Sequence, residues 1–150
     1  MNLVVGATGV LGGEICRHLV ERGRPVRAMV RDSSDPDRVA RLRGIGAEVV
    51  RGDLKDPRSL EAACRGVRTV VSTAASVHSR QEGDSFDSVD RQGHLSLIDA
   101  AEAAGVGQFV HVAFPPVAVE FPLPKTTHLA RTLPANASVA VPNIHPTFRA

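Results

Sequence analysis

The residues most informative about chemistry are three glycines spaced three apart. Gly6, Gly9 and Gly12 follow an apolar run at residues 3–5 and open a segment with helical periodicity. In a strand-to-helix turn, the first glycine permits the tight turn, the second lets the backbone approach a pyrophosphate, and the third lets the helix pack closely. The helix N-terminus then offers free N–H groups to phosphate. The spacing predicts a dinucleotide site, and a purely structural turn is the alternative.

A second feature, at the end of the next apolar run (residues 26–30), bears on which dinucleotide is bound. An acid here binds the ribose 2′-hydroxyl of NAD, whereas an arginine pairs with the 2′-phosphate of NADP. Arg31 precedes Asp32, and a guanidinium can hold a phosphate through two hydrogen bonds. We therefore expect NADP(H), with NAD(H) possible. The alternative is a solvated Arg31, with Asp32 binding the ribose.

Two further segments complete the expected nucleotide site. Asp53 and Leu54 follow the third apolar run. We expect the carboxylate to accept from the adenine amino group while Leu54 packs on the ring. A loop-capping role for Asp53 is the alternative. The small residues Thr73, Ala74 and Ala75 end the fourth run, and they leave room for ribose and nicotinamide in the crevice where such sheets bind ligands.

Alternating strands and helices must position these residues. The predicted strands are residues 3–5, 26–30, 47–50, 67–73 and 109–114. Helices are expected between them, two with an Asp-Pro start at residues 35–36 and 56–57, and one over residues 86–104. The fourth strand is apolar on both faces, which indicates a parallel sheet covered by helices. A short helix at 125–133 and an edge or broken strand at 139–144, interrupted by Pro142, are also expected.

Composition excludes several function classes. The chain has 150 residues, 43% hydrophobic and 23% charged, with a net charge of +2. These values predict one soluble domain without a strong preference for nucleic acid or anionic membranes. The chain has five Phe but neither Tyr nor Trp. Base stacking on aromatic rows is therefore not expected, nor is acid–base chemistry by a tyrosine.

The cysteines and histidines indicate no metal centre. Cys16 and Cys64 lie far apart, and the six histidines are scattered. We expect both cysteines to be reduced core residues. The apolar runs are shorter than a membrane span, and Met1-Asn2 leads directly into the first strand. We therefore predict a cytoplasmic protein that binds neither membrane nor nucleic acid.

Several segments together resemble the NmrA-like, atypical short-chain dehydrogenase/reductase family. They are GATGVLG (6–12), VRD (30–32), GDL (52–54), VDRQGH (89–94), AAEAAGV (100–106) and IHPTF (144–148). His94 takes the place of a frequent Asn. The resemblance implies an NAD(P)-binding Rossmann fold, a doubly wound, mostly parallel α/β sheet with helices on both faces. It also implies a reductase or a cofactor-sensing regulator, usually with NADP.

The resemblance also exposes departures. Ala113 stands where the family's enzymes often have Ser, and His145 replaces an Arg. The Tyr-x-x-x-Lys pair of typical relatives is missing, because Phe121 stands four residues before Lys125 and phenylalanine cannot transfer a proton. Lys125 resembles the surviving lysine. It is the one catalytic candidate and is expected at the nicotinamide ribose, unless it is merely solvated.

The expected cofactor site comes from the glycine turn, the strand ends and this lysine. Its residues are Gly6, Thr8, Gly9, Val10, Leu11, Gly12, Arg31, Asp53, Leu54, Thr73, Ala74, Ala75 and Lys125. Relatives continue with a smaller substrate-binding part, so residues 1–150 resemble the cofactor-binding domain alone.

Three functions fit the sequence. The first is an NADP(H)-dependent oxidoreductase with a quinone or carbonyl acceptor. The second is a non-catalytic NADP-sensing or binding module, and the third is a sugar-nucleotide epimerase-like enzyme. The expected partners are the dinucleotide and either a second copy of the chain or a regulatory protein.

Overall fold

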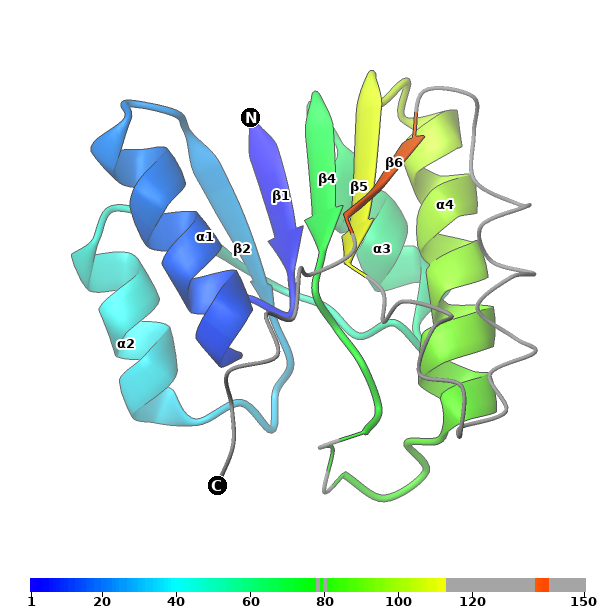
Figure 1. Ribbon diagram of the computed structural model, residues 1–150. Coiled ribbons are helices and arrows are strands. Elements are labelled where there is room, and N and C mark those ends of the chain that lie inside the picture. The colour runs from blue at the N-terminus through cyan, green and yellow to red at the C-terminus, as the bar shows by residue number, and fades with distance from the viewer. Residues whose placement is uncertain (78, 80, 113–136, 141–150) are drawn as a thin grey trace, which may run out of the picture.

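A computed structural model describes residues 1–77, 79, 81–112 and 137–140 (Figure 1). The strands are β1 (Asn2–Val5), β2 (Val26–Val30), β3 (Glu48–Arg51), β4 (Thr69–Ser72), β5 (Gln108–Val112) and β6 (Ala137–Ala140). The helices are α1 (Val10–Glu21), α2 (Pro36–Gly44), α3 (Pro57–Cys64), η1 (Phe86–Gly93) and α4 (His94–Ala103).

Within the described part of the chain, six strands form one parallel sheet in the order β3-β2-β1-β4-β5-β6. The predicted doubly wound sheet is therefore confirmed. The chain reverses its direction of winding between β1 and β4, where sheets of this kind bind ligands beyond the carboxyl ends of the strands. Val5 at the end of β1 is in register with Met29 and Ser72, so the central strands end at nearly the same level.

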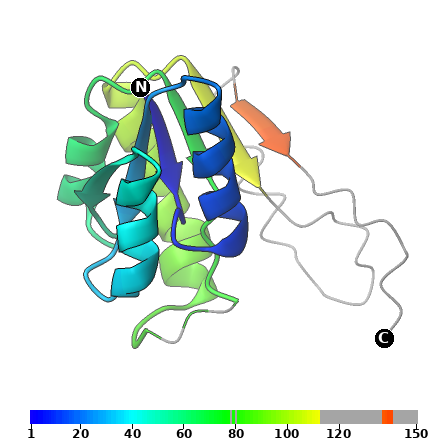
Figure 2. The ribbon, with the colours of Figure 1, turned by 90° about the vertical axis from the view of Figure 1, so that its left-hand side faces the viewer.

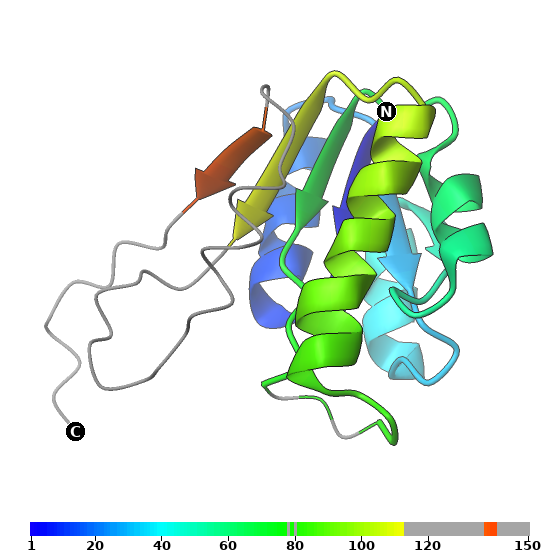
Figure 3. The same cartoon turned by 90° about the vertical axis from the view of Figure 1, so that its right-hand side faces the viewer.

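Helices cover both faces of the sheet, as Figures 2 and 3 show. Helices α1 and α2 pack on a core that contains Val4 and Cys16, whereas α3 and α4 pack on a core that contains Leu3, Val5 and Cys64. Adjacent residues of β1 thus enter opposite cores, which explains why the strands are continuously apolar.

Both cysteines are core residues, as predicted. Cys16 and Cys64 are buried and unpaired. Burial raises the pKa of each thiol to about 11, because the thiolate loses its hydration in the core. The two side chains are therefore neutral at physiological pH.

The predicted helix starts are confirmed by their caps. The Asp35 carboxylate accepts from the backbone N–H of Asp37 and Arg38, and the Asp56 carboxylate accepts from that of Arg58. In each case proline follows in the first turn, where its missing N–H costs no hydrogen bond.

The helix predicted over residues 86–104 differs from a regular α-helix. Its first half, η1, has π-helical winding and begins with a capping box between Ser85 and Ser88. Its second half is α4. Near the junction, Gly93 packs directly on the segment after β3, because a Cβ there would lie 2.8 Å from the Cβ of Leu54. Hydrophobic periodicity alone does not distinguish these two windings.

The sixth strand is at the edge of the sheet, as expected, but it spans Ala137–Ala140 rather than residues 139–144. Pro142 lies outside the described residues. So does the short helix predicted at 125–133.

Helix α1 lies close to β1 because Gly12 has no side chain. A Cβ on Gly12 would lie 2.2 Å from the Gly6 carbonyl oxygen and 2.9 Å from Thr73 Oγ1. Both distances are too short for real atoms. The neighbouring Gly13 is different, because a Cβ there would meet Ala7 O at 3.5 Å, an ordinary contact. The third glycine of the motif therefore sets the distance between helix and sheet.

A small polar layer lies between the sheet and α4. His94 Nδ1 lies 3.0 Å from Val89 O and its Nε2 lies 2.8 Å from Ser72 Oγ. Because a carbonyl only accepts, Nδ1 carries the proton, and Nε2 of the neutral ring accepts from Ser72. The ring of His111 meets that of His94 edge to face, with centroids 4.5 Å apart. His111 Nδ1 finds no hydrogen-bond partner among the described residues.

Burial keeps both imidazoles neutral. Desolvation lowers the pKa of His94, although the Val89 carbonyl opposes the shift. Desolvation, together with the neighbouring His94, lowers the pKa of His111 to about 4. Protonation of either ring would place a charge in the core, and for His111 no acidic group among the described residues opposes its desolvation.

We predict that Gly12→Ala destabilises the fold and that Gly13→Ala does not. The first change forces α1 away from the turn, at a cost of about 1–3 kcal/mol. The second replaces a helical glycine with the best helix former and should stabilise by about 0.5–1 kcal/mol. Urea unfolding followed by circular dichroism measures both, and equal stability of the two variants would contradict the packing described here.

We also predict that the free energy of unfolding decreases as pH falls from about 6.5 toward 4. In this window the unfolded chain binds a proton at His111 that the folded chain excludes. The loss reaches up to about 3 kcal/mol, because each pKa unit is worth about 1.4 kcal/mol. His111→Leu should make the pH dependence shallower. Parallel losses in the wild type and the variant, measured by urea unfolding at pH 7 and 4.5, would exclude His111 as the cause.

Candidate functional site

A cleft of about 340 Å³ opens at the carboxyl ends of β1 to β4. This volume lies within the range of small-molecule sites. The lining includes nine residues that the sequence assigns to the nucleotide site: Gly6, Thr8, Gly9, Arg31, Asp53, Leu54, Thr73, Ala74 and Ala75. The structure thus brings residues from four separate segments of the chain to one place.

The glycine turn forms the floor of this cleft. Gly6 has a φ of +82°, which L-residues with side chains rarely adopt, and a Cβ there would lie 2.7 Å from Thr73 Oγ1. The Gly9 N–H donates to Gly6 O at 3.0 Å and closes the turn. Thr73 Oγ1 donates to Val5 O at 3.2 Å and ties the turn to the end of β4. The turn is therefore held by a hydrogen bond within it and by a second one from the residue after β4.

The N-terminus of α1 opens into the same region. Gly9 is its N-cap residue and has no side chain with which to cap the first turn. The first turn also contains no acidic residue. An anion in the cleft can therefore accept from the N–H groups that begin this helix.

Four residues to which the sequence gives an expected or an alternative role in the nucleotide site do not line the cleft. Gly12 packs beneath the turn, whereas Val10 and Leu11 are exposed (84% and 48%), and Val10 lines a separate hollow beside α1 and α2. The side chain of Asp32, the alternative ribose ligand, is 95% exposed and lies 3.5 Å from Arg51. Lys125, Ala113, Phe121 and His145 lie outside the described residues.

Asp53 is held in place by its own loop and by the segment after β4. Its Oδ1 accepts from the backbone N–H of Lys55 at 2.9 Å, and its Oδ2 accepts from Gln81 Nε2 at 3.4 Å. The carboxylate therefore has the loop contacts that the alternative interpretation predicts, and it also lines the cleft. Leu54 beside it is buried and presents an apolar wall.

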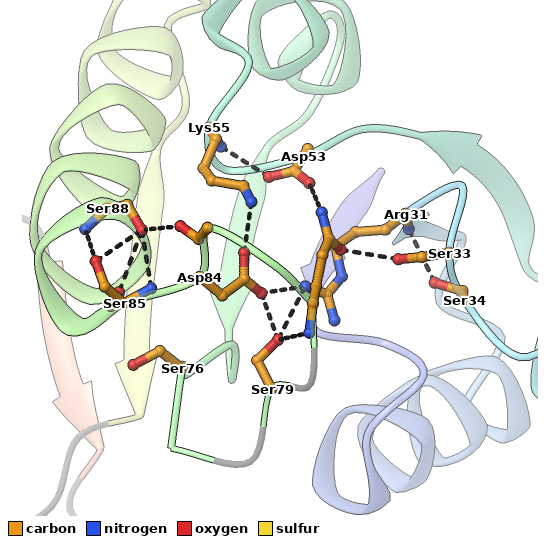
Figure 4. A network of polar contacts seen from close by, with 12 residues as sticks. Arg31, Ser33, Ser34, Asp53, Lys55, Ser76, Ser79, Asp84, Ser85 and Ser88 are labelled. Atoms are coloured by element: carbon orange, nitrogen blue, oxygen red, sulfur yellow. Dashed lines mark hydrogen bonds and ion pairs between the residues drawn. The ribbon is translucent and has the colours of Figure 1, made fainter.

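The polar wall of the cleft is a network centred on Asp84 (Figure 4). Asp84 Oδ2 lies 2.6 Å from Arg31 Nη1, and its Oδ1 lies 2.6 Å from Lys55 Nζ. Ser79 also donates to Oδ2. The Asp84 side chain is only 2% exposed. The burial by itself raises the carboxyl pKa, but hydrogen bonds from Lys55, Ser79 and Arg31 outweigh it and hold the pKa below its ordinary value.

Asp84 comes from the segment between β4 and η1, which the sequence indicates only as a polar loop. Ser76 N donates to Asp90 Oδ2 at one end of this segment, and Ser33 Oγ donates to Gln81 Oε1 from across the cleft. Sequence reasoning missed Lys55 and Asp84, because a polar loop has no periodicity that indicates which side chains turn inward. The one available signal is that Lys55 directly follows Asp53-Leu54.

The described residues contain no group of three side chains suited to hold a metal ion. In the same ranges, no helix is both long and apolar enough to cross a bilayer.

Sequence comparisons relate the chain to known proteins. A family model described as "NmrA-like family" matches residues 2–131. Sterol demethylase protein B of Methylococcus capsulatus is 44% identical over 115 residues, which is 75% of this chain and 34% of that protein. The NAD(P)H azoreductase of Xenophilus azovorans is 39% identical over 110 residues, or 73% of this chain and 34% of the enzyme.

Solved structures agree with the fold. A triphenylmethane reductase from Citrobacter, complexed with NADP(H), has a TM-score of 0.63 at 26% identity, covering 88% of this chain and 43% of the other. A short-chain dehydrogenase/reductase superfamily protein from Agrobacterium tumefaciens with bound NAD has a TM-score of 0.61 at 34% identity, covering 75% and 32%.

The chain spans about a third of the length of the curated relatives that it matches. Within that span, the glycine turn, the parallel sheet and the match over residues 2–131 agree. The chain belongs to the NmrA-like family.

Proposed function

We propose that this chain binds a nicotinamide dinucleotide, NADP(H) in preference to NAD(H), as the cofactor-binding part of an oxidoreductase with a quinone- or carbonyl-type acceptor. The observation that supports this best is the convergence of the glycine turn, Arg31 and Asp53 on one cleft. The cleft fits the cofactor because bare glycine backbone lines it at Gly6 and Gly9, and a Cβ at Gly6 would collide with Thr73 and Ala74. The bound dinucleotide supplies the hydride chemistry, and the protein supplies binding and orientation.

Each part of the cleft has a role in this proposal. The turn and the first N–H groups of α1 hold the pyrophosphate. The Arg31 guanidinium meets the 2′-phosphate. Asp53 and Leu54 hold the adenine, and the small side chains of Ala74 and Ala75 leave space for the nicotinamide riboside.

The relatives favour a reductase. Those with named activities include an azoreductase, a 2-alkyl-3-oxoalkanoate reductase and a triphenylmethane reductase. The absence of tyrosine from the sequence supports the alternative, a non-catalytic NADP-sensing module. It also counts against an epimerase-like enzyme, although a UDP-glucose-4-epimerase shares the fold with a TM-score of 0.64. The cytoplasmic location, the homodimer and the regulatory partner stay predictions from the sequence.

Gly9→Val should abolish binding of both NADPH and NADH and leave the fold intact. The new side chain occupies the approach to the pyrophosphate. The φ of −74° at Gly9 suits valine, and the turn need only yield slightly to the new Cβ, which would lie 3.2 Å from Gly6 O. Titration of nicotinamide fluorescence measures the affinity with little interference, because the chain has no Trp. Gly13→Ala is the matched control and should bind like wild type. Undiminished binding in Gly9→Val would place the dinucleotide elsewhere.

Arg31→Ala should weaken NADPH binding by about ten- to a hundredfold, the value of a hydrogen bond between charged groups. NADH lacks the 2′-phosphate, so its affinity should change little. The same titration measures both. An equal loss for the two cofactors would refute the assignment of NADP(H).

The reductase interpretation predicts that NADPH is turned over, whereas the sensor interpretation requires only that it is bound. An oxidoreductase should oxidise bound NADPH with at least one member of a panel of quinone, azo and carbonyl acceptors, followed at the nicotinamide absorbance. A sensor should bind one redox form more tightly than the other, because a ligand without differential affinity shifts no equilibrium. Binding without turnover would exclude the first interpretation, and equal affinity for both forms would exclude the second.

A further inference from the structure

Asp84 is unusual because its carboxylate has little access to solvent and lies between two cations in the wall of the cleft. It contacts Arg31 and Lys55 at 2.6 Å each, and its side chain is 2% exposed. The Arg31 and Lys55 side chains are 40% and 27% exposed. Asp84 and Arg31 are 53 positions apart in sequence, so this ion pair joins the loop after β4 to the end of β2.

The groups that hold Asp84 are those that a phosphate monoester requires. A guanidinium, an ammonium and the Ser79 hydroxyl all converge on its two oxygens. Guanidinium groups form short, strong hydrogen bonds with phosphate oxygens, and an ammonium acts as a compact point charge beside them. The Asp84 carboxylate therefore occupies a ready-made anion site that includes the arginine at the end of β2.

A 2′-phosphate and the Asp84 carboxylate cannot both form full-strength hydrogen bonds with these donors. The Asp84 carboxylate and the two cations, Arg31 and Lys55, together carry a net charge of +1. A phosphate dianion added to these three groups makes the total charge negative. The phosphate also brings a second anion close to a carboxylate that has little access to water. The ribose 2′-hydroxyl of NAD carries no charge and leaves the network undisturbed.

Resting on the proposed function, we infer that Asp84 is a specificity-determining residue that competes with the 2′-phosphate for Arg31 and Lys55. NADP(H) binds when Asp84 leaves the two cations, whereas NAD(H) binds with Asp84 in place. Asp84 directly precedes Ser85, the N-cap residue of η1, and so lies at the end of the loop after β4.

The test is Asp84→Asn, which keeps the shape and removes the charge. NADPH should bind about ten- to a hundredfold more tightly than to wild type, because the phosphate gains hydrogen bonds from cations that no longer have an internal partner. The affinity for NADH should stay unchanged. Asp87→Asn is the matched control, since this acid pairs with Arg91 and is 67% exposed. It should alter neither affinity.

Two results would overturn the inference. One is an equal change of both affinities in Asp84→Asn. The other is weaker NADPH binding, which would mean that Asp84 positions Arg31 rather than competes for it. If wild-type protein binds neither dinucleotide, the proposed function fails instead, so the two failures are distinct.

Hydrogen exchange of the wild-type protein tests the same inference without a substitution. NADPH should speed the exchange of the backbone amides of Gln81 and Asp84 relative to NADH, because the loop is released from the cations. Equal protection of these amides by both cofactors would contradict displacement of Asp84, even if the Asp84→Asn variant did not fold.

Discussion

The close contact between the glycine turn and the residue after β4 is the constraint on which the rest of the site depends. Gly6 and Gly12 have no side chains, so Thr73 can lie against the turn and donate to Val5 O at 3.2 Å. This contact places the N-terminus of α1 at the point where the sheet reverses its winding. Loss of it would move both the N–H groups proposed to bind the pyrophosphate and the strand end proposed to face the nicotinamide. One packing distance therefore positions two functional regions.

Interactions between residues close together in the sequence account for the features that the sequence predicts well. The glycine turn and the two Asp-Pro helix starts each depend on residues within a few positions of one another, and both turn out as expected. The Arg31–Asp84 pair joins residues 53 positions apart, through a loop whose composition indicates only exposure. Its partners could not be predicted, because which loop side chain turns inward is decided by the tertiary structure. The π-helical winding of η1 is missed for a related reason, since its apolar spacing also fits a regular helix.

The charge network around Asp84 also changes what Arg31 indicates about the cofactor. At the end of β2, an arginine alone favours a 2′-phosphate. In the structure its guanidinium already has an anionic partner, and that partner is also held by Lys55. Ion pairs with partly exposed cations are weak evidence for stability, because water screens their attraction and desolvation of the carboxylate offsets part of it. In our proposal, the network therefore matters more for selecting a ligand than for holding the fold together.

The two ends of the cleft differ in the chemistry that they can supply. The end proposed for the adenosine is lined by the charged groups Arg31, Asp53 and Asp84, whereas the end proposed for the nicotinamide has Thr73, Ala74 and Ala75. None of these three side chains is a proton donor near neutral pH. Hydride transfer itself needs orientation rather than a protein acid. In the proposed oxidoreductase, the described part of the cleft would therefore suit an acceptor whose reduction needs no protein acid. A quinone is such an acceptor, because its reduced anion is a much weaker base than the alkoxide formed from a simple carbonyl.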